Sequence, residues 1–159
     1  MSKSLARVRT ALDRAGLSAE ILEMSDGTRT AADAARAAGC TVDQIAKSII
    51  FRRAEDDAPV LVIASGTNRV DEAKVSAHVG ALAKADAKFV REKTGYAIGG
   101  VCPIGHAVAP VMLLDQDLFL YDSVWAAAGH PHAVFSLTPQ QLQAMTGAEV
   151  ADVAQVTSA

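Results

Sequence analysis

The sequence predicts a single α+β domain in which helices pack on a mixed or mostly antiparallel sheet. The chain has 159 residues, a length that suits one domain with one core. Half of its residues are hydrophobic and 21% are charged, the balance of an ordinary globular protein. Segments with helical spacing are interspersed with short β-branched runs, and no repeat or linker separates them. We therefore assign residues 1–159 to one domain.

The first two expected helices begin or end at residues with capping chemistry. Apolar residues at helical spacing predict a helix over residues 3–15, which ends before Gly16. Thr30 begins the second helix, because Asp33 follows three residues later in the arrangement of a capping box. Gly39 ends this helix.

Three further helical segments follow the same logic. A short turn of helix is expected at residues 41–43. Asp71 caps a helix that runs to Val79. Thr138, followed by a proline, begins the last helix, and Gly147 ends it.

Short apolar or alternating runs predict the strands. They are expected at residues 19–24, 45–53, 60–64, 88–90, 110–114, 118–121 and 133–136. The acidic residues 55–57 and Pro59 predict a hairpin turn between the second and third of these strands. Residues 115–117 are expected to form another turn.

The net charge limits the kind of partner. With 15 Lys and Arg against 18 Asp and Glu, the chain carries −3, whereas proteins that grip many phosphates usually carry a basic excess. A nucleic-acid contact should therefore be local, such as the end of one strand. The apolar runs are far shorter than the roughly 20 residues of a membrane span, and we expect no membrane contact. With no secretory signal and only two cysteines, we expect a cytoplasmic protein.

Standard catalytic constellations are missing from the sequence. It contains no Cys-x-x-Cys pair, no P-loop and no Gly-x-Ser-x-Gly elbow. His130 and His132 could bind a metal, but neither a carboxylate nor a third ligand is near them in the sequence, so we expect no metal and no cofactor. Cys102 lies in a glycine-rich loop whose amides could activate a thiolate, although no base partner is evident.

Two features remain as candidate sites. Lys47 lies at the start of an apolar strand, where its ammonium must reach water, a carboxylate or a ligand; the alternative is a lysine that extends outward from an edge strand. The loop from Gly99 to Gly105 contains three glycines and one proline. Its N–H groups could converge on an anion or a developing oxyanion, and the alternative is a purely structural turn.

Four blocks in order resemble the YbaK/EbsC family, which is related to the editing insertion domain of bacterial prolyl-tRNA synthetase. The blocks are residues 44–48, residues 65–71, residues 94–105, and residues 137–139 with Leu142 and residues 146–148. The resemblance extends from about residue 30 to residue 153 and implies a compact, barrel-like sheet with flanking helices. It also implies hydrolysis of the ester that joins a wrong amino acid to the acceptor end of tRNA, with small amino acids such as Ala, Cys or Ser as substrates.

The resemblance also assigns roles to residues. The family's lysine falls on Lys47, beside Ser48 as a substrate-binding residue. Its Gly-x-x-x-Pro loop falls on Gly99, Gly100, Val101, Cys102 and Pro103. Because the family often has Ser in place of Cys102, the resemblance argues against a thiol nucleophile. Gly129 and His130 resemble a stretch that lines the amino-acid pocket in some members.

Three hypotheses follow for function. The first is an aminoacyl-tRNA deacylase in which Lys47 acts as a cation beside loop amides. The second is a non-catalytic module that binds tRNA ends, nucleotides or a synthetase in the same cleft. The third is a hydrolase of another ester that uses Cys102. A synthetase is also a candidate partner of the deacylase, because an acidic protein gains little tRNA affinity from its own charge.

Overall fold

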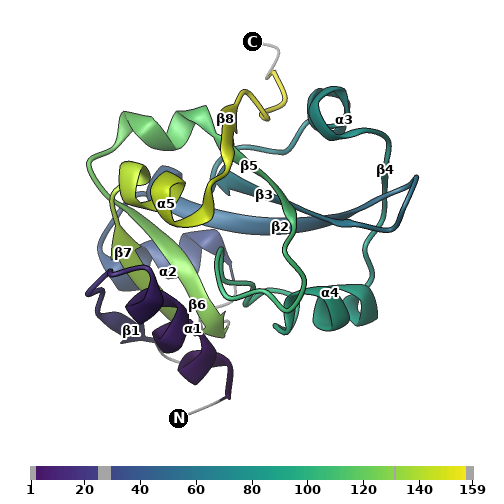
Figure 1. The fold of residues 1–159 in the computed structure, drawn as a ribbon. Helices are drawn as coiled ribbons and strands as arrows, with labels where there is room; N and C mark the ends of the chain where they lie inside the picture. The colour runs from purple at the N-terminus through teal and green to yellow at the C-terminus, as the bar shows by residue number, and fades with distance from the viewer. Residues whose placement is uncertain (1–2, 25–29, 131, 157–159) are drawn as a thin grey trace.

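The computed structural model describes residues 3–24, 30–130 and 132–156, which form helices packed on one eight-stranded sheet (Figure 1). The helices are α1 (Lys3–Arg14), α2 (Ala31–Ala38), α3 (Glu72–Val79), α4 (Ala87–Thr94) and α5 (Pro139–Thr146), with 3-10 turns η1 (Val42–Gln44) and η2 (Gln116–Leu120). The strands are β1 (Ile21–Glu23), β2 (Ile45–Arg53), β3 (Pro59–Ser65), β4 (Leu82–Ala83), β5 (Val111–Asp115), β6 (Val124–His130), β7 (Ala133–Leu137) and β8 (Glu149–Ala151). None of the described helices is long and apolar enough to cross a bilayer.

The sheet is mixed, as expected. Its order is β1-β7-β6-β2-β3-β5-β8, with β4 paired to β2. Pairing is antiparallel within β1-β7, β7-β6, β2-β3 and β2-β4, and parallel within β6-β2, β3-β5 and β5-β8. The described strands end at β1 on one side and β8 on the other, so the barrel-like sheet is open.

The sheet has a narrow join between β2 and β6. Only two residue pairs are in register there, Ile45 with Trp125 and Ala46 with Ala126. By contrast, β2 and β3 are paired over seven positions, from Ala46 with Ser65 onward. The join therefore connects a half-sheet of β1, β7 and β6 to a larger half-sheet built on the β2-β3 hairpin.

Strand β3 lies at the centre of the larger half-sheet, and all seven of its residues are buried. Val60 and Val62 pack in the cluster under α3, whereas Leu61 and Ile63 belong to the main core on the other face. A strand covered on both faces is a continuous apolar run rather than an alternating one. This burial explains why the sequence identified β3 so clearly.

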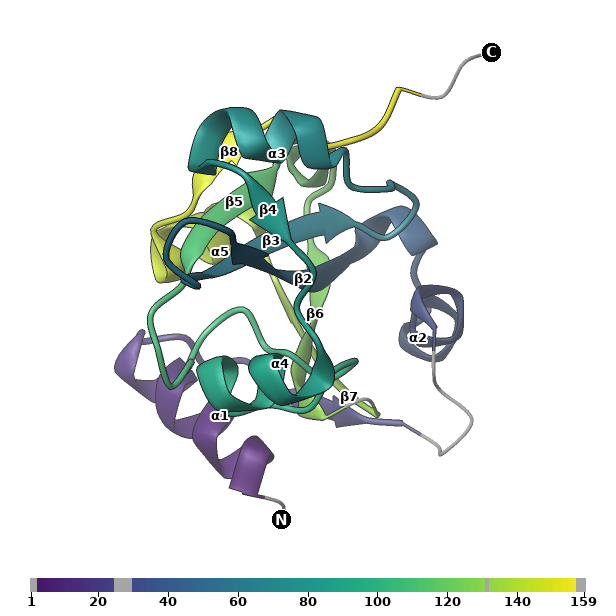
Figure 2. The same cartoon turned by 90° about the vertical axis from the view of Figure 1, so that its right-hand side faces the viewer.

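Strand β6 has two differently covered faces. Val124, Ala126 and Ala128 pack in the main core with the apolar side of α1, while Trp125 packs in a separate cluster with α2. Figure 2 accordingly shows α1 and α2 on opposite sides of β6. The two faces therefore belong to two different surfaces of the molecule.

Most expected elements are confirmed. The hairpin of β2 and β3 is present. Thr30 and Asp33 form the expected capping box, with Gly39 in the left-handed conformation at the other end of α2. Asp71 caps α3 through the N–H groups of Ala73 and Lys74. Local capping chemistry is therefore a dependable guide here.

Two expected strands are wrong. Residues 88–90 lie inside α4, because the Asp86 side chain accepts a hydrogen bond from the N–H of Phe89 and starts a helix that ends at Gly95. Residues 118–121 fall largely in η2, because the Asp115 side chain caps this turn through the N–H of Asp117. In both places a capping aspartate outweighs the β-forming residues that follow it.

Three strands have no counterpart in the sequence expectations: β4, β6 and β8. β6 contains an alanine run at residues 126–128, which gives neither β-branched enrichment nor polar alternation. β4 and β8 are two and three residues long. Such short strands form because a neighbouring strand offers an edge.

Asp115 should contribute strongly to stability. Its carboxylate is fully buried and accepts hydrogen bonds from the N–H of Ser65 and from Nδ2 of Asn68, at 3.0 and 2.8 Å. Replacing Asp115 with Ala leaves the N–H groups of Ser65 and Asp117 without an acceptor, while Asn68 keeps its bond to Asp117. This loss should lower the free energy of unfolding in urea by about 2–3 kcal/mol. The control is Glu92→Ala, which breaks only the exposed pair with Lys88 and should cost below about 0.5 kcal/mol. Equal losses in the two variants would contradict this role.

Candidate functional site

A cavity of about 220 Å³ lies between α2, the join of β2 and β6, strand β7 and the glycine-rich loop. Four residues expected from the sequence line it: Lys47, Ser48, Gly99 and Val101. The other lining residues are Thr30, Ala31, Ala34, Ile45, Ala46, Trp125, Ala127, Ala133 and Val134. The structure thus brings the lysine and the loop, about fifty residues apart in the chain, to one small and largely apolar space.

Lys47 is a partly buried cation at this cavity. It lies near the start of β2, and its Nζ donates to the carbonyl of Gly66 at 3.4 Å. Burial lowers the pKa of Lys47, the negative charge of Asp115 opposes this shift, and the positive charge of Arg69 adds to it. An ammonium has three donors, and one is engaged within the described part of the chain. Lys47 is therefore equipped to meet an anion or a polarised carbonyl.

Gly66 makes this arrangement possible. A Cβ at this position would collide with the carbonyl oxygen of Val42 in η1. The absence of a side chain lets the segment after β3 lie against η1 and present the Gly66 carbonyl to Lys47. The Ser65 hydroxyl fixes the same contact by donating to the carbonyl of Asp43 at 2.7 Å.

Sequence reasoning gave no role to Asp115 and Arg69, although both act on Lys47. Asp115 was expected only as part of a turn, and Arg69 lies in one of the four family blocks without an assigned role. Asn68 bridges the carboxylates of Asp115 and Asp117, with distances of 2.8 Å to each. An aspartate directly after an apolar strand is the signal that could have identified Asp115.

The loop borders the cavity through two residues, Gly99 and Val101. Gly99 has a φ of +89°, a conformation that favours glycine. The N–H of Gly100 donates to the carbonyl of Ala97 at 3.0 Å and closes a turn. In the part of the chain that the structure describes, the N–H groups of Gly99 and Val101 have no acceptor. Of the loop residues expected to stabilise an oxyanion, these two line the cavity, whereas Gly100, Cys102 and Pro103 do not.

Cys102 and Pro103 are buried residues of the loop. The Cys102 side chain is fully buried in the main core, and burial raises the pKa of its thiol to about 12. Its carbonyl is bonded to Nε2 of His106 at 2.6 Å, and a carbonyl only accepts, so Nε2 carries the proton. Neither Cys102 nor Pro103 is among the cavity-lining residues. Because the Cys102 thiol is buried, has a raised pKa and does not line the cavity, the structure disfavours Cys102 as a nucleophile.

Ser48 has an unusual environment. Its Oγ is buried and has no hydrogen-bond partner among the described residues. Buried hydroxyls are normally paired, because an unpaired one costs desolvation energy. Ser48 lines the cavity, but its Oγ is closed off from that space.

The structure does not bring Gly129 and His130 to the cavity lining. Strand β6 has a bulge between Ala127 and His130, and Gly129 lies on the α1 side of it. A Cβ on Gly129 would come within 2.9 Å of the Val8 side chain. The bulge therefore turns Gly129 toward α1, so the pocket-lining role that the resemblance implies for Gly129 does not fit this structure.

His130 and His132 contact each other. Nδ1 of His130 accepts from the N–H of His132 at 3.1 Å, and the two ring centroids are 5.2 Å apart. Among the described residues, no three His, Cys, Asp or Glu side chains lie together as potential metal ligands.

Comparison with known proteins identifies the family. The sequence profile of the aminoacyl-tRNA editing domain matches residues 25–145. The chain belongs to this family. It is 33% identical to the uncharacterized protein YwhH of Bacillus subtilis (strain 168) over 148 residues, which is 92% of this chain and 94% of YwhH. The resemblance seen in the four sequence blocks is thus confirmed.

Solved structures agree with this assignment. A crystal structure of a suggested trans-editing enzyme for prolyl tRNA synthetase superposes with a TM-score of 0.93 at 44% identity and covers 98% of this chain and 99% of its own. The hypothetical protein APE2540 superposes with a TM-score of 0.85 at 30% identity, covering 94% and 99% of the two chains. The expected fold is therefore confirmed in detail.

The burial of Cys102 predicts its reactivity. Iodoacetamide should modify Cys40, which is partly exposed, and leave Cys102 unmodified until the protein unfolds, because Cys102 is buried and its pKa is high. Mass spectrometry of tryptic peptides measures both rates. In a Cys40→Ser control the native protein should take up no label, and rapid native labelling of Cys102 would show that its thiol is accessible.

Proposed function

We propose that this protein is an aminoacyl-tRNA deacylase that acts in trans on tRNA charged with a wrong, small amino acid. The observation that carries the proposal is that Lys47, Gly99 and Val101 line one cavity of about 220 Å³. Membership in the editing-domain family supports the choice of substrate.

The chemistry requires few groups from the protein. An aminoacyl ester is already activated, so water adds to its carbonyl carbon and a tetrahedral oxyanion forms. The N–H groups of Gly99 and Val101 stabilise this oxyanion. Collapse breaks the bond to the ribose oxygen, which takes up a proton, and releases the free amino acid. A neighbouring ribose hydroxyl of the substrate positions the water, and the Lys47 ammonium holds the terminal phosphate or polarises the ester.

Selection of the amino acid rests on size. The cavity is smaller than the roughly 300–1,000 Å³ of pockets for drug-sized ligands. Alanine residues form much of its wall, namely Ala31, Ala34, Ala46, Ala127 and Ala133. Such a pocket suits the side chains of Ala, Cys or Ser. Discrimination by size gives only about 1–3 kcal/mol per methylene, so we expect modest specificity.

A second candidate function is a module that binds tRNA ends or a synthetase without catalysis. The described lining residues include no carboxylate, imidazole or thiol, so Lys47 is the titratable side chain among them. With Lys47 in its cationic form, catalysis in this site depends on the substrate's own hydroxyl, and a substrate without that hydroxyl would only bind.

Replacing Lys47 tests the proposal directly. A panel of mischarged tRNAs (Ala, Cys and Ser on tRNA for proline, with Ser and Thr on other tRNAs) should be hydrolysed by the wild type. Lys47→Ala should lower the rate by about tenfold or more, because a charge-assisted contact of about 1.5–3 kcal/mol is lost. Loss of labelled amino acid from tRNA measures the rate.

The matched control is Lys74→Ala, which removes a lysine that pairs with Asp152 outside the cavity and should leave the rate unchanged. If the wild type hydrolyses none of the panel while tRNA binding persists, the deacylase proposal fails and the binding module stands.

Narrowing the cavity tests its role in selection. Ala31 lines the cavity and the adjacent Ala32 is exposed. Ala31→Leu should reduce hydrolysis of Thr-tRNA more than that of Ala-tRNA, because the larger side chain loses more space. Ala32→Leu, the same substitution one residue along α2, should change neither rate. Parallel losses for both substrates in Ala31→Leu would show that the cavity does not select by size.

A further inference from the structure

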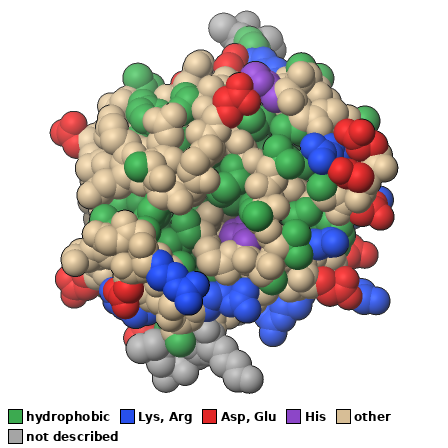
Figure 3. Space-filling model, in the orientation of Figure 1, with side chains coloured by type: hydrophobic (Ala, Val, Ile, Leu, Met, Phe, Trp, Pro, Cys, Tyr) green, Lys and Arg blue, Asp and Glu red, His purple; other side chains and the backbone are tan. Residues whose placement is uncertain are grey.

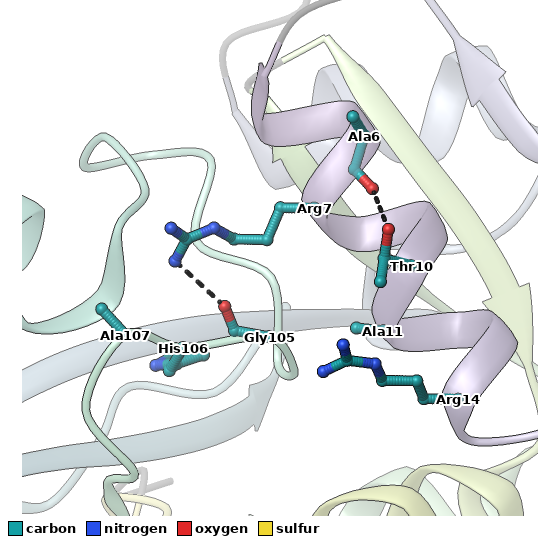
Figure 4. A pocket seen from close by; sticks show the side chains of 8 residues that line it. All are labelled: Ala6, Arg7, Thr10, Ala11, Arg14, Gly105, His106 and Ala107. Atoms are coloured by element: carbon teal, nitrogen blue, oxygen red, sulfur yellow. Dashed lines mark hydrogen bonds between the residues drawn. The ribbon is translucent and has the colours of Figure 1, made fainter.

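A second hollow lies between α1 and residues 105–107. It has a volume of about 500 Å³ and is lined on the helix side by Arg7, Thr10 and Arg14 and on the loop side by Gly105 and His106 (Figure 4). We call it the α1 cleft. Helix α1 packs on the main-core face of β6, whereas the cavity of the candidate site includes Trp125 and Ala127 from its other face. The α1 cleft is therefore separate from the proposed ester site.

Two arginines project into this cleft from one side of α1. Arg7 and Arg14 are seven residues apart, which is two helical turns, so their side chains leave the same face about 10 Å apart along the axis. Figure 4 shows both side chains extending from α1 toward residues 105–107. The described lining contains no acidic residue. Both positive charges thus face one space without a carboxylate in its walls.

Arg7 is held in place by the protein. Its Nη1 donates to the carbonyls of Thr94 and Gly105, at 3.3 and 3.2 Å, and its guanidinium carbon lies 5.8 Å from the centre of the Tyr96 ring. These contacts use only Nη1, and a guanidinium has five N–H donors. The other donors of Arg7 make no hydrogen bond among the described residues and are available to an anion.

Arg14 supplies the second charge. It is exposed and, within the described residues, makes neither an ion pair nor a hydrogen bond through its side chain. Between the two arginines the surface is built of small groups, Ala11 and Thr10, with Gly105 opposite. A Cβ on Gly105 would lie 2.6 Å from the Tyr96 hydroxyl oxygen and 3.3 Å from the Cβ of Ala11. The loop therefore lies close against α1 and Tyr96, as the wall of the cleft.

Positive charge is concentrated on one part of the surface. The whole chain carries −3, yet Lys and Arg side chains gather along the lower part of the face in Figure 3, from the region of α1 toward that of α4, with acidic side chains at both ends. A basic cluster on an acidic protein attracts anions to one place, whereas the rest of the surface does not attract them.

We propose that the α1 cleft is a phosphate-binding site in which Arg7 and Arg14 bind one phosphorylated ligand between them. Guanidinium groups match phosphate oxygens through paired N–H donors. A phosphate group bound here could belong to the backbone of an RNA strand or to a small phosphorylated molecule. The site goes beyond the proposed function, because it lies on the other face of β6 and requires no hydrolysis.

The test uses the full chain. The probes are pyrophosphate and an acceptor-stem RNA minihelix that carries no amino acid. Arg14→Gln removes the free charge with little risk to folding, because Arg14 is exposed. Arg36→Gln is the matched control, since it removes an exposed arginine from α2, where its partner is Asp33 at 3.7 Å. Calorimetry gives the affinity for each probe, and amide NMR shifts show where each probe binds.

Pyrophosphate should shift the amides of residues 105–107, and Arg14→Gln should weaken its binding about fivefold or more relative to Arg36→Gln. If RNA is the source, Arg14→Gln should also reduce the salt dependence of minihelix binding by about one phosphate contact. If a small molecule is the source, minihelix binding should be equal in both variants.

Equal pyrophosphate affinity in both variants, or shifts confined to Lys47 and the loop at Gly99, would overturn the proposal. Neither probe carries an ester to be hydrolysed, so failure of the deacylase proposal would leave this result unaffected.

Discussion

The buried carboxylate of Asp115 is the interaction on which the candidate site depends. A buried charge is tolerated only when hydrogen bonds surround it, and here the donors are Ser65, the last residue of the neighbouring strand β3, and Asn68 just beyond it. Those bonds fix the segment that carries Gly66, whose carbonyl receives Lys47. The negative charge of Asp115 also opposes the effect of burial on the pKa of Lys47. One side chain thus positions the lysine and helps to keep it cationic.

The loop between α4 and β5 is held just as firmly, by polar groups set in the core. The hydroxyl of Thr94 donates to the carbonyl of Val90, and that of Tyr96 to the carbonyl of Ile104. His106 closes the arrangement at the carbonyl of Cys102. This support fixes an irregular, glycine-containing segment of which Gly99 and Val101 line the cavity.

Much of the fold could be predicted from local chemistry, because caps and apolar periodicity are properties of short segments. The helix caps at Thr30 and Asp71 and the hairpin of β2 and β3 are of this kind. β6 was not predicted, because an alanine run has no β signature of its own and becomes a strand only between β7 and β2. At the site, the structure brings Lys47 and Gly99 to one cavity, and their catalytic roles stay a prediction. It does not bring Gly129 there, because a β-bulge turns this residue toward α1, and a comparison of sequence positions does not reveal a bulge.

The join between the two half-sheets affects the width of the pocket. The cavity spans it, with Ile45 and Ala46 on one side and Trp125 and Ala127 on the other, and only two residue pairs hold the strands in register there. The pocket walls thus belong to both half-sheets, which also share one hydrophobic core. Ile63 and Leu114 of one half-sheet pack in that core with Ala126 and Phe135 of the other, so side-chain packing supports the short join. The width of the pocket therefore depends on how the two half-sheets pack together as much as on the side chains that line it.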